Sequence, residues 1–242
     1  MIDWKKYFDK IFCIHFMPFM ERVAKLNSEL SRVGILNSGI FEPRYTFPSV
    51  HCMVLYNLLK QNNLTTVPHN AAFNLMVATY NIIKESMFMG YERILILEDD
   101  VAFLKNIDEI KDILDNIPSD FGICLFDKFK PYDMADEEYK NQLKDNVNQY
   151  YFRFNRLFST GCYSLSKDAI SRLVNMYETD CENTDVYICK FDKTGPNDKI
   201  ASIKNLCCQL TYEDASNILN GGIDNQDNIY KSQGLNYNDY NI

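Results

Sequence analysis

A short run of aliphatic residues that ends abruptly in three acids constrains the fold of this chain more than any other feature. Residues Arg93 to Leu97 read RILIL, and Glu98-Asp99-Asp100 follows directly. A strand with one solvated face alternates apolar and polar residues, whereas a strand buried on both faces is continuously apolar, as in a parallel sheet. The run therefore predicts the central strand of a mostly parallel sheet in an α/β fold.

The rest of the chain is consistent with strands that alternate with helices. Apolar runs predict strands at residues 10–16, 121–126, 150–154, 161–165, 200–203 and 206–210. Apolar residues at helical spacing, with Asn or Ser caps and Gly or Pro stops, predict helices at 18–33, 50–60, 70–87, 106–117, 166–177 and 185–189. Residues 35–70 otherwise predict loops, one of them over the site, and the polar stretch 127–150 predicts a solvated excursion that is partly helical.

The domain organisation follows from length and composition. The chain has 242 residues, of which 46% are hydrophobic, so one large domain can bury a sizeable core. We assign this domain to residues 1–219. Residues 220–242 are rich in Asn, Asp, Gly and Tyr without a period, and we expect an irregular tail there.

Charge and cysteine usage limit the partners and the compartment. A formal net charge of −8 argues against a nucleic-acid binder. No apolar run approaches the length of a transmembrane helix, which leaves only peripheral membrane association open. Most of the eight cysteines lie in apolar runs, as reduced, buried cysteines do, and we therefore expect a cytoplasmic protein. The sequence is silent on oligomeric state.

The three acids after the central strand suggest a cation site. Ligands of open α/β sheets collect at the carboxyl ends of the strands, and the run carries Glu98, Asp99 and Asp100 to that edge. Adjacent carboxylates repel one another, and Mg²⁺ or Mn²⁺ would compensate that repulsion and grip a diphosphate. If the strand continues, Glu98 and Asp100 share one face. Composition alone leaves open that the acids only cap the next helix or form surface turns.

Four segments also resemble one protein family. They are IFCIH at 11–15 followed by Glu21-Arg22; GYERILILEDDV at 90–101; GCYSLSKDA at 161–169 with Asp185-Val186-Tyr187 downstream; and Gln209 followed by Ser216-Asn217-Ile218. Together they resemble glycosyltransferase family 25, the lipooligosaccharide-type galactosyltransferases. The second segment is the most specific, because it matches the family's acidic motif almost residue for residue.

The resemblance implies a GT-A-like, Rossmann-type fold that binds a nucleotide sugar. It implies transfer of a sugar, with galactose from UDP-galactose as the expected case, to a glycan acceptor such as a lipooligosaccharide or a related cell-surface glycan. It also implies a Mn²⁺ or Mg²⁺ ion at the acidic motif. The chain departs from the family in two places: residues 71–75 (AAFNL) lack the usual Ser-His pair, and His15 stands where the family has Asn or Ser.

The resemblance and the strand-end positions together give each candidate residue a role. We assign the metal to Glu98 and Asp100, and the ribose or the donor sugar to Asp99. Arg22 is a candidate for the nucleotide or its phosphates, and His15 for the base.

Two further carboxylates are candidates for the catalytic base. Asp127 ends the strand that follows the acidic motif, and Asp185 matches the family's downstream Asp. An inverting transferase needs such a carboxylate to take the proton from the acceptor hydroxyl.

Two other functions stay open on the sequence. One is a family member without activity that binds a sugar or a partner, which the missing Ser-His pair favours. The other is a metal-dependent phosphohydrolase, which also uses clustered acids. The chain has only three histidines, fewer than a hydrolase of that kind usually employs.

Overall fold

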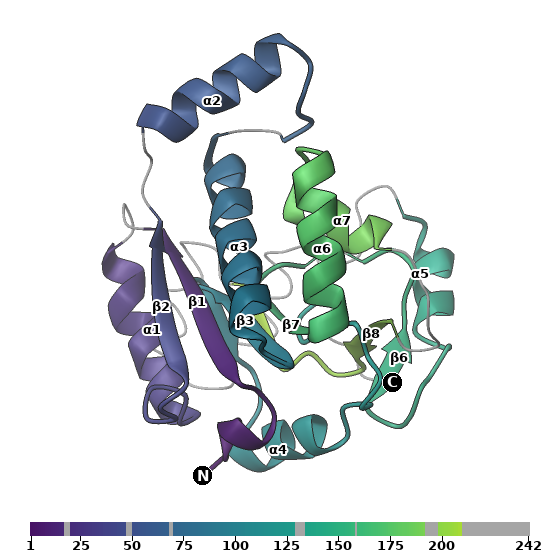
Figure 1. The fold of residues 1–242 in the computed structure, drawn as a ribbon. Coiled ribbons are helices and arrows are strands. Elements are labelled where there is room, and N and C mark those ends of the chain that lie inside the picture. Colours follow the sequence, from purple (N-terminus) through teal and green to yellow (C-terminus); the bar gives the residue numbers. More distant parts are fainter. Residues whose placement is uncertain are drawn as a thin grey trace.

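A seven-stranded sheet forms the centre of the protein (Figure 1). The computed structural model describes residues 1–16, 20–46, 50–67, 70–128, 134–157, 159–191 and 198–209. The strand order is β2-β1-β3-β7-β5-β8-β6. The strands are β1 (Lys10–Phe16), β2 (Phe41–Thr46), β3 (Arg93–Glu98), β5 (Ile123–Leu125), β6 (Tyr151–Arg153), β7 (Cys162–Ser166) and β8 (Lys199–Ser202).

Most of the sheet runs in one direction. Strand β1 pairs parallel with β2 and with β3, and β5 pairs parallel with β8. Strand β7 lies antiparallel between β3 and β5, and β6 is antiparallel to β8 at the edge. All strands except β7 and β6 therefore share one direction, and the predicted α/β class with a mostly parallel central sheet is confirmed. A separate two-stranded sheet joins β4 (Val101–Phe103) to β9 (Cys207–Gln209).

Helices cover both faces of the sheet. They are α1 (Met20–Arg32), α2 (Val50–Gln61), α3 (Asn70–Met89), α4 (Ile107–Asp115), α5 (Asp136–Gln142), α6 (Lys167–Thr179) and α7 (Thr184–Lys190), and a 3₁₀ turn, η1, spans Trp4–Lys6. Figure 1 shows α3 and α6 side by side over one face. Core residues of α1, α4 and η1 pack against the other face.

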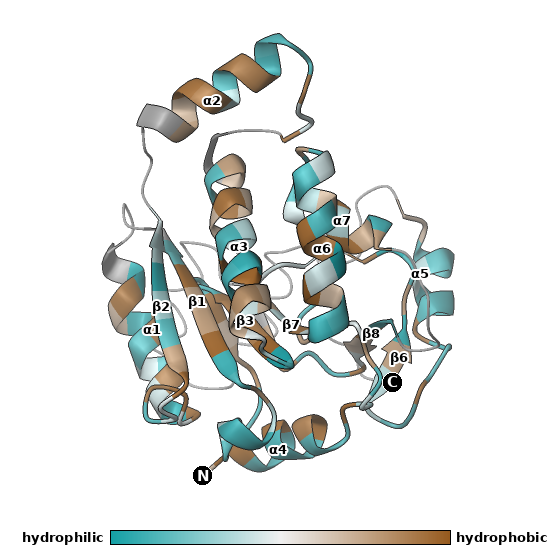
Figure 2. Ribbon diagram, viewed as in Figure 1, coloured by the Kyte–Doolittle hydropathy of each residue, from teal (hydrophilic) through white to brown (hydrophobic). Residues whose placement is uncertain are grey.

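The central strand β3 shows why its sequence is continuously apolar. Ile94 and Ile96 belong to the core under α3 and α6, whereas Leu95 and Leu97 belong to the core under α1 and α4. All four side chains are fully buried. Figure 2 shows the resulting band of hydrophobic residues through β1 and β3.

Local signals in the sequence placed the helix ends correctly. Asn106 caps α4 in a capping box with Glu109, and the Ser166 side chain accepts a hydrogen bond from the Ala169 N–H at the start of α6. Gly34 and Gly90, which follow α1 and α3, adopt φ values of +79° and +71°, a region that favours glycine.

Strand β2 lies in a region for which the sequence predicts loops. Its sequence, FEPRYT, is polar and contains Pro43. It forms because it is an edge strand that pairs only with β1, so Pro43 interrupts no second ladder. The short strand β4 was also not predicted, and β5 is shorter than the predicted strand at 121–126. The predicted tail at 220–242 lies outside the described residues.

Helix α2 lies beyond the ends of β1 and α3, above the body of the protein (Figure 1). Several of its apolar side chains are about half exposed, namely Met53, Val54, Leu55 and Leu58. Within the described part of the chain, no helix combines the length and the apolar character that a membrane span requires. The cysteines whose side chains are described are all free thiols.

Candidate functional site

Strand β3 carries the three acids to the carboxyl edge of the sheet. Glu98 is the last residue of β3, and its N–H donates to the Gly161 carbonyl at 2.8 Å. Asp99 and Asp100 form a turn, and the chain continues into β4. The turn ends the strand, so the acids do not follow the two-residue alternation that a longer strand would impose.

Asp99 is held by two cationic or ionisable side chains from other elements. The His15 Nδ1 lies 2.6 Å from Asp99 Oδ2, and the Arg22 Nη1 donates to Asp99 Oδ1 at 3.0 Å. His15 comes from β1, where its neighbour Ile14 is in register with Glu98, and Arg22 comes from the first turn of α1. Only 6% of Asp99 is exposed, so this is a buried ion-pair network.

The same network has atoms that can still bind a ligand. The Arg22 Nη1 also lies 3.6 Å from Asp100 Oδ2, and the Arg22 side chain is 24% exposed. His15 is buried, and its Nε2 has no hydrogen-bond partner among the described residues. Its ring lies edge-on to Tyr45, with the centroids 5.5 Å apart. The arrangement leaves Arg22 able to meet an anion at the edge of the sheet.

Glu98 belongs to a second group, in which carboxylates repel one another. Burial raises the pKa of Glu98 well above its usual value, and the negative charges of Asp100, Asp185 and Asp127 raise it further. A hydrogen bond with the Thr160 side chain opposes this effect. A carboxylate with a pKa raised in this way is stabilised by any cation that enters the group.

Asp127 follows β5 and is fully buried. Its Oδ1 accepts hydrogen bonds from the Ser159 hydroxyl and from the Cys162 N–H, the latter at 3.1 Å. Its Oδ2 has no partner among the described residues. Burial raises the pKa of Asp127 to about 7, against the effect of these two hydrogen bonds.

Asp185 lies in the first turn of α7 and is only partly buried as a residue. Burial of its carboxyl group raises its pKa to about 6, and a hydrogen bond from the Ser159 backbone opposes this effect. Its Oδ1 is buried without a partner among the described residues. Asp185 and Asp127 thus share Ser159 as a hydrogen-bonding neighbour.

The structure therefore brings all the predicted site residues to one edge of the sheet. His15, Arg22 and Asp99 form one network, and Glu98, Asp127 and Asp185 form the carboxylate group. Asp100 connects the two, because it lies beside Arg22 and raises the pKa of Glu98. The roles of these residues stay predictions.

Sequence reasoning missed three residues around the site. Ser159 and Thr160 hold Asp127 and Glu98, and their only signal was their position directly before the segment at 161–169. Lys128 is buried next to Asp127, and its Nζ donates to the carbonyls of Ser202 and Ile203 and to Asn205 Oδ1 at 2.7 to 2.9 Å. Burial lowers the pKa of Lys128 to about 7. Nothing in its polar sequence neighbourhood indicated burial.

The chemistry of the carboxylate group fits a divalent cation that shares its ligands with a substrate. Among the described residues, no three His, Cys, Asp or Glu side chains stand close enough to enclose a metal ion by themselves. Mg²⁺ in nucleotide sites usually takes only one or two carboxylates and completes its shell with phosphate oxygens and water. The unpartnered oxygens of Asp127 and Asp185 and the raised pKa of Glu98 indicate a group that lacks positive charge.

Comparison with known proteins adds two distant similarities in fold. No family model matches the chain, and no curated protein matches its sequence. The solved structure of mouse xyloside xylosyltransferase 1, in its apo form, aligns with 70% of this chain and 70% of its own, at 12% identity and a TM-score of 0.35. A glycosyltransferase involved in the glycosylation of the major capsid of PBCV-1 aligns with 77% of this chain and 69% of its own, also at 12% identity and a TM-score of 0.35. At these values neither similarity supports a conclusion about activity.

Proposed function

We propose that the protein is a metal-dependent glycosyltransferase that uses a nucleoside-diphosphate sugar as donor. The observation that carries this proposal is the convergence of Glu98, Asp100, Asp127 and Asp185 with Arg22 at the carboxyl edge of a mostly parallel sheet. Excess negative charge beside an accessible arginine suits a complex of a cation with a diphosphate better than either component alone. The resemblance of residues 90–101 to the family 25 motif favours UDP-galactose as donor and a glycan as acceptor.

We assign each residue at this edge of the sheet a separate role in binding the donor. Glu98 and Asp100 would hold a Mn²⁺ or Mg²⁺ ion, which supplies positive charge against the charge that builds on a leaving diphosphate. Arg22 would contact a phosphate, because its guanidinium is partly exposed and lies between Asp99 and Asp100. Asp99 has both oxygens engaged by His15 and Arg22, so we assign it to orienting these two side chains in place of the contact with the ribose or the donor sugar that the sequence predicts. The Nε2 of His15, which is buried without a partner among the described residues, would be the atom that meets the nucleotide.

The geometry favours Asp185 over Asp127 as the base that takes the proton of the acceptor hydroxyl. Asp185 is less buried as a residue than Asp127, and a pKa of about 6 leaves it largely ionised above pH 7. Asp127 is fully buried and binds the segment before β7 through Ser159 and Cys162. We therefore assign Asp127 to positioning and Asp185 to proton transfer.

A thermal-shift titration tests the donor site directly. UDP with Mn²⁺ is expected to raise the melting temperature by mass action, and EDTA is expected to abolish the rise. The substitutions Glu98→Gln and Asp100→Asn should each remove the metal-dependent part, whereas Asp112→Asn on the exposed face of α4 should leave it intact. A rise of equal size with EDTA, or in both variants, would contradict the proposal.

A transfer assay separates the competing functions. Hydrolysis or transfer of UDP-galactose that requires Mn²⁺ supports a transferase, and Asp185→Asn should retain UDP binding while losing transfer. Binding of UDP-galactose without turnover, under any acceptor or metal condition, would favour the binding protein instead. Release of phosphate from simple phosphate esters would favour the phosphohydrolase.

A further inference from the structure

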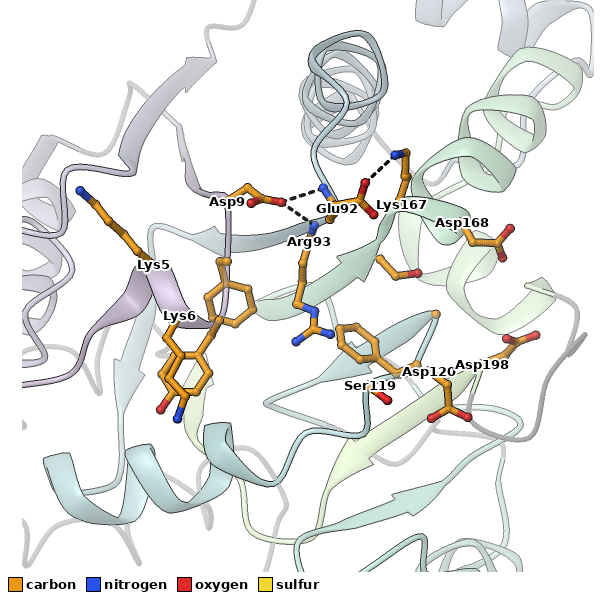
Figure 3. A pocket seen from close by; sticks show the side chains of 15 residues that line it. Lys5, Lys6, Asp9, Glu92, Arg93, Ser119, Asp120, Lys167, Asp168 and Asp198 are labelled. Carbon is orange, nitrogen blue, oxygen red and sulfur yellow. Dashed lines mark hydrogen bonds and ion pairs between the residues drawn. The ribbon is translucent and has the colours of Figure 1, made fainter.

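A cavity lies at the opposite edge of the sheet from the acids. It has a volume of about 650 Å³ and opens where β3 and β5 begin and β7 ends (Figure 3). Its lining includes residues of η1, the turn before β5 and the start of α6. None of the candidate residues for the donor site contributes to it.

Arg93, the first residue of β3, points its guanidinium into this cavity (Figure 3). The guanidinium carbon lies 4.8 Å from the centre of the Phe121 ring, a cation–π contact that restrains the side chain. Within the described part of the chain, the guanidinium has no hydrogen bond or ion pair. Burial lowers the pKa of Arg93, because it removes part of the hydration of the charge, and the Coulombic effects of Cys124, Asp9 and Tyr151 oppose this lowering.

The acids nearest to Arg93 in the chain and across the sheet are engaged elsewhere. Asp9 Oδ2 accepts the backbone N–H groups of Glu92 and Arg93, at 2.7 and 2.9 Å. The Glu92 carboxylate pairs with Lys167 at 2.5 Å. Asp9 therefore acts on the charge of Arg93 without a hydrogen bond to its guanidinium, and this charge effect raises the pKa of Arg93.

The remaining acids of the lining also have partners other than Arg93. Asp168 and Asp198 both pair with Arg172, at 3.1 and 3.3 Å. Asp120 has an interaction of its own with another residue. The acids of the lining thus leave the fork of N–H donors on Arg93 able to meet a ligand.

We propose that this cavity binds a small oxyanion, a phosphate or a carboxylate group, on the guanidinium of Arg93. Arginine presents two parallel N–H donors that match the spacing of the oxygens in either group. The site is independent of the proposed donor site, because it lies at the other end of β3.

Arginine side-chain NMR tests the proposal on the intact protein. The chain has seven arginines, so the Nε–Hε signal of Arg93 can be identified by its loss in Arg93→Gln. Inorganic phosphate and benzoate are titrated separately, at low ionic strength and with EDTA. We expect at least one of them to shift the Arg93 signal to saturation, and the anion that does so identifies the ligand as a phosphate or as a carboxylate.

The variants distinguish this site from the donor site. Because the Arg93 variants lack the Arg93 signal, the affinity of every variant is read from the backbone amide signals of the residues that line the cavity. Arg93→Gln should weaken binding at least about tenfold, as loss of a charge-assisted hydrogen bond implies, whereas Arg22→Gln should leave it unchanged. Arg93→Lys keeps the charge and the fold but loses the fork, and it should also weaken binding. Absence of a saturable shift with both anions, or unchanged affinity in Arg93→Lys, would overturn the proposal.

Discussion

Replacing Asp127 by asparagine should change how the stability of the metal-free protein depends on pH. The folded protein holds the Asp127 carboxyl in a fully buried position, where its pKa is about 7 instead of its ordinary 3.8. Between these two pH values the folded state keeps a proton that the unfolded state has lost. The stabilisation present at low pH is therefore lost as the pH rises through 7. Asparagine has no charge to bury and avoids this loss.

The size of the effect follows from the shift in pKa. A difference of about three units at about 1.4 kcal/mol per unit gives about 4 kcal/mol between pH 4 and pH 8. The amide keeps an oxygen for Ser159 and Cys162, but its NH₂ group replaces the unpartnered Oδ2 and costs about 1–3 kcal/mol. That cost is the same at both pH values and cancels when the two are compared. The free energy of unfolding of the variant, relative to that of wild type, should thus rise by about 4 kcal/mol from pH 4 to pH 8.

Urea denaturation followed by circular dichroism, in EDTA at five pH values from 4 to 8, measures this difference. Asp112→Asn, on the exposed face of α4, is the matched control for the same chemical change at the surface. If the stability difference between Asp127→Asn and wild type varies by less than about 1 kcal/mol over this range, the buried charge assigned to Asp127 is wrong.

Four other substitutions test the packing and the buried charges of the fold. Asp99→Asn should lower the free energy of unfolding by about 2–3 kcal/mol in urea, because it leaves Arg22 and His15 without their carboxylate partner; an unchanged midpoint would contradict the buried network. Gly122→Ala should cost about 2–4 kcal/mol, because its Cβ would lie 2.7 Å from the Asp198 carbonyl oxygen. Gly90→Ala, with φ +71° but nothing within 4 Å of the new Cβ, should cost only about 1–2 kcal/mol. If Gly122→Ala and Gly90→Ala lose the same stability, the clash expected at Gly122 is wrong. Relative to wild type, the free energy of unfolding of Lys128→Met should fall by up to about 4 kcal/mol between pH 7 and pH 10 in the same denaturation assay. The pKa of Lys128 is about 7 in the folded protein and 10.5 in the unfolded chain, so between these pH values the unfolded chain binds a proton that the folded protein has released. The wild type therefore gains stability from this group as the pH rises, and the methionine variant does not. If the two stability curves run parallel over this range, the lowered pKa assigned to Lys128 is wrong.

The sequence predicted the elements whose local pattern agrees with their place in the fold. The run at 93–97 read as buried on both faces because each of its residues meets one of two cores. Helices α4 and α6 were predicted from their caps, which act over three residues. Strand β2 was missed because its polar sequence takes its strand conformation from backbone pairing with β1, which no local pattern records.

The sequence predicted which residues belong to the site, but not which of them contact one another. Strand-end position and the family resemblance named every candidate carboxylate. The pairing of Asp99 with His15 and Arg22, which lie 84 and 77 residues away, was not predictable because contacts over such separations depend on how β1, α1 and β3 pack. The burial of Lys128 and the hydrogen bonds of Ser159 were unpredictable for the same reason, because they also depend on how distant segments pack.

Strand β3 shows both what the sequence determines by itself and what depends on the tertiary structure. Its composition by itself determined that it lies inside an α/β sheet and delivers three acids to one edge, because hydrophobic burial and the direction of a strand are properties of the segment. Only the tertiary structure decided which side chains pair with those acids. It also decided that Arg93, at the other end of the strand, faces a cavity in which its guanidinium forms no hydrogen bond or ion pair with the described residues. Charge pairing depends on distances between segments that the chain order leaves free.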